Sequence, residues 1–146
     1  MEEKFMKEAL KQAKKAASIG ETPIGAVIVR DGEIIARGYN KRETKKNALL
    51  HAEIIAINKA CKKLGGWRLP RCEMYVTLEP CPMCAGAIIN AHIPNVYFGA
   101  YDFKNGSCGT ITNLFEMPYN FKPNCKGGIM QEECAELLKS FFKRLR

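Results

Sequence analysis

The chain has 146 residues, of which 47% are hydrophobic and 26% charged, a balance that excludes a wholly disordered polypeptide. Its 23 Lys and Arg against 15 Asp and Glu give a net charge of +8, which is typical of proteins that bind a polyanion such as nucleic acid and equally of a generic basic surface. No apolar run approaches the ~20 residues of a membrane-spanning helix, and the N-terminus shows no secretory signal. We therefore expect one domain over residues 1–146, a cytoplasmic location and no membrane partner.

Hydrophobic periodicity and turn residues divide the chain into alternating helices and strands. A first helix carries apolar residues at helical spacing and ends at Gly20. Asp31-Gly32 between two β-rich runs is a strong hairpin signal. In chain order, the predicted elements are this first helix, strands Ile24–Arg30 and Glu33–Tyr39, a helix Ala48–Lys63 ended by Gly65-Gly66, a strand Glu73–Leu78, a helix Pro82–Asn90, a strand Val96–Ala100 and a helix Gln131–Leu145.

This order of elements predicts a three-layer α/β/α sandwich in which helices cover both faces of a mixed five-stranded sheet. The strands after the hairpin are separated by helices, so we expect them to run parallel to their neighbours. Residues Phe121–Lys126 would supply the fifth strand. Because Pro123 has no backbone N–H, this strand fits only at an edge of the sheet.

Seven cysteines are many for a chain without a secretory signal, and their odd number cannot pair completely. In a reducing compartment such thiols are more often buried, catalytic or metal-bound than disulfide-linked. Cys81 and Cys84 differ from the others in their Cys-x-x-Cys spacing. The remaining five are predicted to be small buried apolar residues: Cys61, Cys72, Cys108, Cys125 and Cys134.

Two short segments, His51-Ala52-Glu53 and Pro80-Cys81-Pro82-Met83-Cys84, carry the candidate chemistry. Two cysteines three residues apart at a helix start point to the same side, and the helix dipole lowers the cost of their thiolates. His51 adds a nitrogen ligand from a second helix. Three ligands of N and S type fit a tetrahedral zinc ion with an open fourth position, which is the pattern of a catalytic site, although iron fits the same ligands.

Glu53 is the predicted proton carrier of this site. Zinc with two thiolates has no net charge, so that it acidifies water less than zinc held by three neutral histidines, and a nearby base is needed. Glu53 is close to the metal ligands in sequence and free not to bind the ion. Two other interpretations of the cysteines are a redox pair and a closed structural zinc site with Cys72 or Cys108 as its fourth ligand.

The pattern His-x-Glu followed by Pro-Cys-x-x-Cys resembles the signature of the zinc-dependent cytidine deaminase superfamily. Segments 20–27, 75–81, 84–88, 98–100 and 141–143 extend the similarity to bacterial tRNA adenosine deaminases over most of the chain. This resemblance implies a cytidine-deaminase-like fold, one Zn²⁺ per chain and a homodimer. It also implies hydrolytic deamination of adenosine to inosine at the wobble position of a tRNA anticodon stem-loop.

The resemblance also assigns roles to individual residues. It implies His51, Cys81 and Cys84 as zinc ligands and Glu53 as proton shuttle. The implied substrate contacts are Asn40 on the flipped purine, the backbone of Ala52 on the base, Asp102 near the sugar and backbone, and Glu21 and Pro23 at the pocket rim. Taken without the resemblance, Asn40 is typical of a turn at a strand end and Asp102 of a loop cap.

Some positions depart from the family pattern and keep a second substrate class open. Ala48-Leu49-Leu50 stands where the family commonly has Pro-Thr-Ala, Tyr101 and Phe103 flank Asp102, and residues 120–126 depart from the usual strand-like sequence. We therefore expect changes in the pocket wall and its surroundings. The alternatives are a deaminase of a free nucleobase or nucleoside, such as guanine or cytosine, and a catalytically silent RNA-binding scaffold. Basic residues before the zinc helix and at the C-terminus favour RNA, although alone they suit a solvated loop and a frayed end: Lys41, Arg42, Lys45, Lys46, Lys143, Arg144 and Arg146.

Overall fold

The computed structural model describes residues 2–145, so that Arg146 of the basic C-terminus lies outside the described residues. None of the helices within this range is long and apolar enough to cross a lipid bilayer. In chain order the elements are α1 (Glu2–Ser18), β1 (Gly25–Arg30), β2 (Glu33–Tyr39), α2 (Ala52–Leu64), β3 (Cys72–Leu78), α3 (Pro82–Ala91), β4 (Asn95–Ala100), the short 3₁₀ helix η1 (Leu114–Glu116), β5 (Asn124–Lys126) and α4 (Gln131–Arg144).

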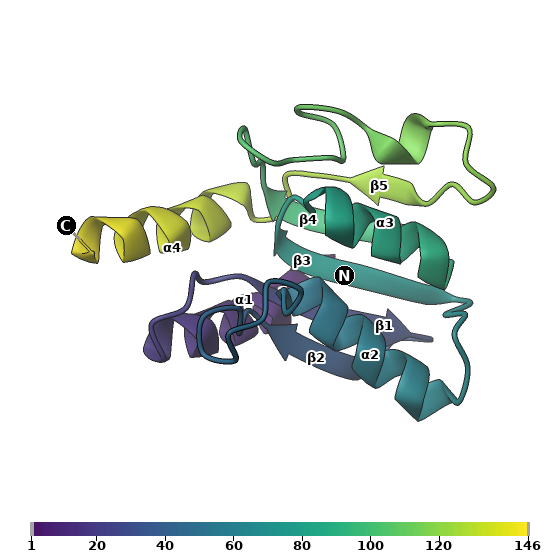
Figure 1. Cartoon of the computed structure of the whole chain (residues 1–146), viewed down its shortest axis with the longest axis horizontal. Helices are drawn as coiled ribbons and strands as arrows, with labels where there is room; N and C mark the ends of the chain where they lie inside the picture. Colours follow the sequence, from purple (N-terminus) through teal and green to yellow (C-terminus); the bar gives the residue numbers. More distant parts are fainter. Residues whose placement is uncertain (1, 146) are drawn as a thin grey trace.

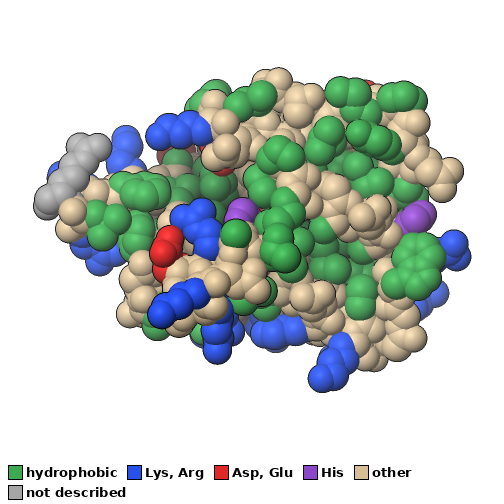
Figure 2. Space-filling view, in the orientation of Figure 1, with side chains coloured by type: hydrophobic (Ala, Val, Ile, Leu, Met, Phe, Trp, Pro, Cys, Tyr) green, Lys and Arg blue, Asp and Glu red, His purple; other side chains and the backbone are tan. Residues whose placement is uncertain are grey.

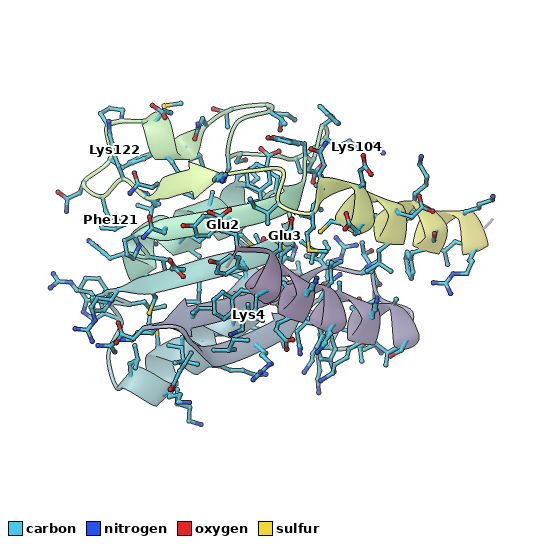
Figure 3. The ribbon with its side chains drawn as sticks, turned by 180° about the vertical axis from the view of Figure 1, so that it is seen from behind. Glu2, Glu3, Lys4, Lys104, Phe121 and Lys122 are labelled. Carbon is cyan, nitrogen blue, oxygen red and sulfur yellow. The ribbon has the colours of Figure 1, made fainter. Side chains whose placement is uncertain are left out.

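The strands form one five-stranded sheet in the order β2-β1-β3-β4-β5 between two layers of helices. Helices α2 and α3 cover one face, whereas α1 and the start of α4 cover the other (Figure 1). Figure 3 views the molecule from behind, so that this second face is in front, and it shows Lys104 on the loop beyond β4. Each face has its own buried apolar cluster. The predicted α/β/α sandwich with a mixed sheet is confirmed, and the organisation of residues 1–146 as one domain stays a prediction.

The expectation that strands after the hairpin run parallel to their neighbours is wrong at one position. β3 pairs with β4 and β4 pairs with β5 in parallel, but β3 is antiparallel to β1. The chain leaves β2, forms α2 and returns on the other side of β1, so that β1 lies antiparallel between two strands of the same direction. β5 is an edge strand as predicted, and it is only three residues long because it begins after Pro123.

Helix α2 begins at Ala52, four residues later than predicted. The preceding residues form a closed loop in which the Lys41 N–H donates to the Leu50 carbonyl at 3.0 Å. His51 is extended, with φ −75° and ψ 157°, and therefore stands as the N-cap residue of α2. The helix ends at Gly65 in the left-handed conformation, as predicted.

Close packing between α2 and β2 holds the start of this helix against the sheet. A Cβ atom at Gly38 of β2 would collide with the carbonyl oxygen of Ala52 and the backbone nitrogen of Ala56. Glycine at this position therefore lets the first turn of α2 approach the strand closely. This contact fixes the place of His51 and Glu53 relative to the sheet.

The prediction for the isolated cysteines is correct for three of the five. Cys72, Cys108 and Cys134 are buried, whereas Cys61 and Cys125 are partly exposed. Cys61 lies near the end of α2 beside the Trp67 carbonyl, and Cys125 lies on the edge strand β5. Both occupy the margin of the structure, where one side of a residue faces solvent.

Candidate active site

A cavity of about 270 Å³ opens at the end of the sheet where α2 and α3 begin. Its wall is built from the segment before β1, the end of β2, the N-termini of α2 and α3, and the loop that follows β4. Phe142 from the last turns of α4 completes the lining. The cavity thus gathers residues that lie more than 100 positions apart in the sequence.

His51 and Cys81 of the cavity wall form a group with the buried Cys84 in which every ligand atom lies within 4.8 Å of the others. The Nδ1 atom of His51 is 3.7 Å from the Cys81 sulfur and 3.6 Å from the Cys84 sulfur. A tetrahedral zinc ion with ordinary Zn–S and Zn–N bonds separates sulfur and nitrogen by about 3.6 Å. The three side chains therefore fit one zinc ion, as the sequence predicted for them.

Two helix N-termini make this corner favourable for thiolates. Cys81 is the N-cap residue of α3, and Pro82 occupies the first turn, where a missing N–H costs nothing. A hydrogen bond from the Cys84 thiol lowers the pKa of Cys81 to about 4. The same hydrogen bond raises the pKa of Cys84, and Cys81 also raises the pKa of His51. Two sulfur atoms that share a negative charge are suitable ligands for a divalent cation.

Glu53 lies in the first turn of α2 and lines the cavity beside the three ligands. The side chain is only 3% exposed, and its Oε1 atom is a buried polar atom without a hydrogen-bond partner among the described residues. Burial raises the pKa of Glu53 to about 7. A buried carboxyl oxygen without a partner is costly unless a ligand satisfies it, so Glu53 points to a bound water or substrate group at this place.

Asn40 lines the cavity at the end of β2 and is 5% exposed. Its Nδ2 donates to the Thr22 carbonyl at 3.3 Å, and its Oδ1 accepts from the Arg42 N–H at 3.1 Å. The turn role considered for Asn40 is therefore present. An amide NH₂ has two hydrogens and its oxygen two lone pairs, so one of each remains for a ligand. Ala52 also lines the cavity.

Asp102 both caps a loop and lines the cavity. Its Oδ1 caps the loop by accepting from the N–H groups of Lys104 at 3.0 Å and Asn105 at 3.1 Å. The residue is also part of the cavity wall, together with Lys104 and Asn105. The capping bonds fix the orientation of the carboxylate and leave its Oδ2 atom without a protein partner in the described part of the chain.

Glu21 and Pro23 do not line the cavity, although Thr22 between them does. Glu21 is 1% exposed, and its carboxylate accepts the N–H groups of Glu43 at 3.2 Å and Thr44 at 2.5 Å. It therefore holds the basic loop before α2 from behind the wall. A contact of Glu21 or Pro23 with substrate stays a prediction.

The family departures lie in the surroundings of the cavity and not in its wall, which is one of the two places expected for them. Leu49, Leu50, Tyr101 and Phe103 are absent from the lining, and Phe103 is 82% exposed. The Tyr101 ring packs edge-on against Phe98 with centroids 5.0 Å apart, which turns it away from the cavity. These side chains therefore modify the surface around the opening.

Sequence reasoning missed several members of the wall: Leu78, Glu79, Lys104, Asn105 and Phe142. A signal existed for Phe142, because two adjacent phenylalanines on one helix cannot both face the same core. Phe141 is buried and Phe142 is 47% exposed. For Glu79 the signal was only its place beside Pro80, which does not reveal where the carboxylate points.

The fold and this site define a deaminase of the cytidine-deaminase-like class. A family model described as MafB19-like deaminase matches residues 1–146, and the chain belongs to this family. It is 51% identical over 146 residues to the tRNA-specific adenosine deaminase of Bacillus subtilis strain 168, covering 99% of this chain and 91% of the relative. The predicted resemblance is thereby confirmed.

Two solved structures resemble the chain at different levels. A tRNA:A34 deaminase studied for A-to-I editing at the wobble position of transfer RNA has a TM-score of 0.89 and 44% identity, over 92% of this chain and 98% of its own. A guanine deaminase from Bacillus subtilis has a TM-score of 0.67 and 33% identity, over 97% of this chain and 93% of its own. One fold thus carries both substrate classes that the sequence left open.

Proposed function

We propose that this protein deaminates adenosine to inosine at the wobble position of a tRNA anticodon stem-loop. The observation that carries the proposal is the buried, unpartnered Glu53 oxygen beside the group of His51, Cys81 and Cys84. The relative with 51% identity over nearly the full chain and the structure with a TM-score of 0.89 support tRNA adenosine as substrate. A cytoplasmic location stays a prediction.

The reaction adds water to C6 of adenine, breaks the bond from C6 to the exocyclic nitrogen and releases ammonia. His51, Cys81 and Cys84 would hold a zinc ion, which when bound supplies Lewis acidity toward the attacking water. Glu53 takes the proton that this water loses and returns protons to the ring nitrogen and the departing ammonia. Burial keeps solvent away from this carboxyl and so directs its proton transfer to the bound substrate.

The remaining wall residues hold the base and its backbone. Asn40 offers one amide hydrogen and one lone pair to the polar edge of the purine, and Ala52 offers its backbone. Asp102 and Lys104 lie on the loop that faces the cavity from β4, in reach of the sugar and phosphates that follow a flipped base. A single-stranded anticodon loop can place a base in such a pocket at modest cost.

The deciding experiment is a side-by-side assay of ammonia and product. Zinc-loaded protein is incubated with an anticodon stem-loop that carries wobble adenosine, and separately with guanine, cytosine, adenosine and cytidine. We expect inosine in the RNA and no turnover of the small molecules. Turnover of guanine with unchanged RNA would instead establish the second candidate, which the 33% identity to a guanine deaminase favours.

An RNA substrate predicts strong salt dependence of binding. Arg42 and Lys104 line the cavity, and Lys41, Lys45 and Lys46 lie on the adjoining loop. Release of counterions from about three phosphate contacts lowers the affinity about tenfold or more between 50 and 200 mM salt. Fluorescence anisotropy with a labelled stem-loop measures this slope. An affinity that is independent of salt would contradict contact of these side chains with the phosphates.

We also propose that the protein is a homodimer through the face of α3. Figure 2 shows hydrophobic side chains gathered over α2, α3 and the neighbouring segment. Pro82 and Ile89 of α3 form a shallow groove there with Leu114 and Tyr119, and Tyr119 is 54% exposed. Such a contiguous apolar face is typical of an interface between copies of one chain.

The interface predicts that Tyr119→Glu yields a monomer. Light scattering after size exclusion should give twice the 16.4-kDa chain mass for wild-type protein and the single mass for the variant. Ile19→Glu is the control, since Ile19 is 48% exposed but follows α1 on the other side of the sheet. A wild-type monomer, or a Tyr119→Glu dimer, would refute this interface.

A further inference from the structure

Glu79 is a buried carboxylate between β3 and α3 whose hydrogen bonds go to a loop distant in sequence. It is 2% exposed. Its Oε1 accepts the Asp102 N–H at 3.1 Å, and its Oε2 accepts the N–H groups of Cys108 at 3.0 Å and Thr110 at 3.2 Å. The Thr110 hydroxyl lies 3.1 and 3.0 Å from the two oxygens. One side chain thus binds both ends of segment 102–110.

The segment closes around this carboxylate as a compact ring. The Gly106 N–H donates to the Asp102 carbonyl at 2.9 Å, and a Cβ at Gly106 would collide with Asp102, Thr110 and the Glu79 carboxyl carbon. The Ser107 N–H donates to the Pro80 carbonyl at 2.9 Å. Glu79 and Pro80 together therefore tie the loop to the strand end that continues into Cys81.

The carboxylate has no cationic partner among the described residues, since none of their ion pairs involves Glu79. A buried charge is tolerated only when hydrogen bonds compensate for its lost hydration. Here three backbone N–H groups do so, and all of them belong to the loop. The single hydrogen of the Thr110 hydroxyl is shared between this carboxylate and the Asp102 carbonyl, which lies closer at 2.8 Å. The charge of Glu79 and the conformation of segment 102–110 consequently depend on each other.

We propose that Glu79 is a positioning residue for substrate binding. It fixes the loop so that Asp102, Lys104 and Asn105 face the cavity beside the Cys81 corner. Glu79 itself does not touch the reacting atoms, because its oxygens are committed to the loop. This inference rests on the proposed function, in which the loop binds the sugar and backbone of the flipped nucleotide.

Glutamine at this position tests the charge with almost no change in volume. Each carboxylate oxygen accepts at least one backbone N–H, so the NH₂ group of Glu79→Gln faces a donor in either orientation of the amide. The loop must then move away from the side chain. Glu79→Asp keeps the charge and is expected to restore part of the lost binding.

The first measurement is amide hydrogen exchange on the zinc-loaded proteins, which needs no substrate. We expect exchange in segment 102–110 to accelerate at least tenfold in Glu79→Gln, with α1 unchanged and one zinc per chain retained. Glu21→Gln is the matched control: it removes a buried carboxylate that holds the loop before α2 from behind the cavity wall, so exchange should accelerate in residues 41–46 and not in segment 102–110. Unchanged exchange in segment 102–110 of Glu79→Gln would overturn the proposal.

The second measurement is steady-state kinetics on the anticodon stem-loop. We expect KM to rise about tenfold in Glu79→Gln while kcat stays within about threefold. Asp102→Ala should also raise KM, and the double variant should match the larger single effect, because both changes act through one loop. The proposal would be overturned if the increases in KM of the two single variants multiplied in the double variant, or if kcat of Glu79→Gln fell at constant KM.

Two controls keep the result interpretable. If Glu79→Gln does not fold, Thr110→Val removes the hydroxyl that lies between the Asp102 carbonyl and the same carboxylate without changing side-chain shape, and about a threefold rise in KM is then expected. If wild-type protein does not act on the RNA, the proposed function fails. The exchange measurement still decides whether Glu79 holds the loop.

Discussion

Glu53→Gln lowers kcat for deamination by about 10²–10⁴-fold, the range that a general acid–base contributes, while zinc content and fold are retained. The substitution keeps the volume of the side chain and removes only its ability to take up and return a proton. Because the Glu53 Oε1 atom has no protein partner among the described residues, an amide NH₂ at that position breaks no structural hydrogen bond. Metal analysis and the ammonia assay on the same preparation check both parts.

The thermal stability of Glu53→Gln provides a second, independent test. Burial disfavours the charged form of Glu53, so that replacing the carboxyl by a neutral amide removes a cost of folding. The thermal midpoint of metal-free Glu53→Gln should therefore equal or exceed that of metal-free wild type. Glu73→Gln is the matched control: Glu73 lies at the opposite end of β3 and does not line the cavity, so activity should stay within about twofold. Retention of a tenth or more of wild-type kcat in Glu53→Gln would refute the proton-shuttle role.

The grouping of the candidate metal ligands with Glu53 was predictable because their spacing is local. Cys81 and Cys84 are separated by less than one helical turn, so that helix geometry brings them to one side of α3. His51 and Glu53 share a corner because His51 is the extended N-cap residue of α2 and Glu53 lies in its first turn. The element order likewise determined the layered architecture. What brought the two pairs into one corner is the pairing of β1 with both β2 and β3, which places the N-termini of α2 and α3 side by side.

Features that depend on long-range contacts were not predictable. The late start of α2 follows from hydrogen bonds that close the loop from Lys41 to Leu50, and no periodic pattern records them. The role of Glu79 depends on a loop more than 20 residues away. Phe142 reaches the cavity only because α4 packs beside β4 and β3. In each case a single side chain acts through a tertiary contact that leaves the sequence pattern unchanged.

Cys84→Ala should abolish zinc binding and lower turnover more than about 10³-fold, because two ligands cannot close a tetrahedral site around an ion that needs three. Cys72→Ala is a close control, since Cys72 and Cys84 are both fully buried. Loss of the Cys72 sulfur leaves a small void and costs about 1 kcal/mol of stability, with zinc and activity retained.

Cys84→Ala should in addition lose the stabilisation that bound metal gives to the folded state, so that added zinc raises the melting temperature of Cys72→Ala but not of Cys84→Ala. Chelation of wild-type protein should reproduce the inactive state, and added zinc should reverse it. A Cys84→Ala protein that carries one metal ion per chain and still releases ammonia would show that the three residues are not the ligands that the reaction needs.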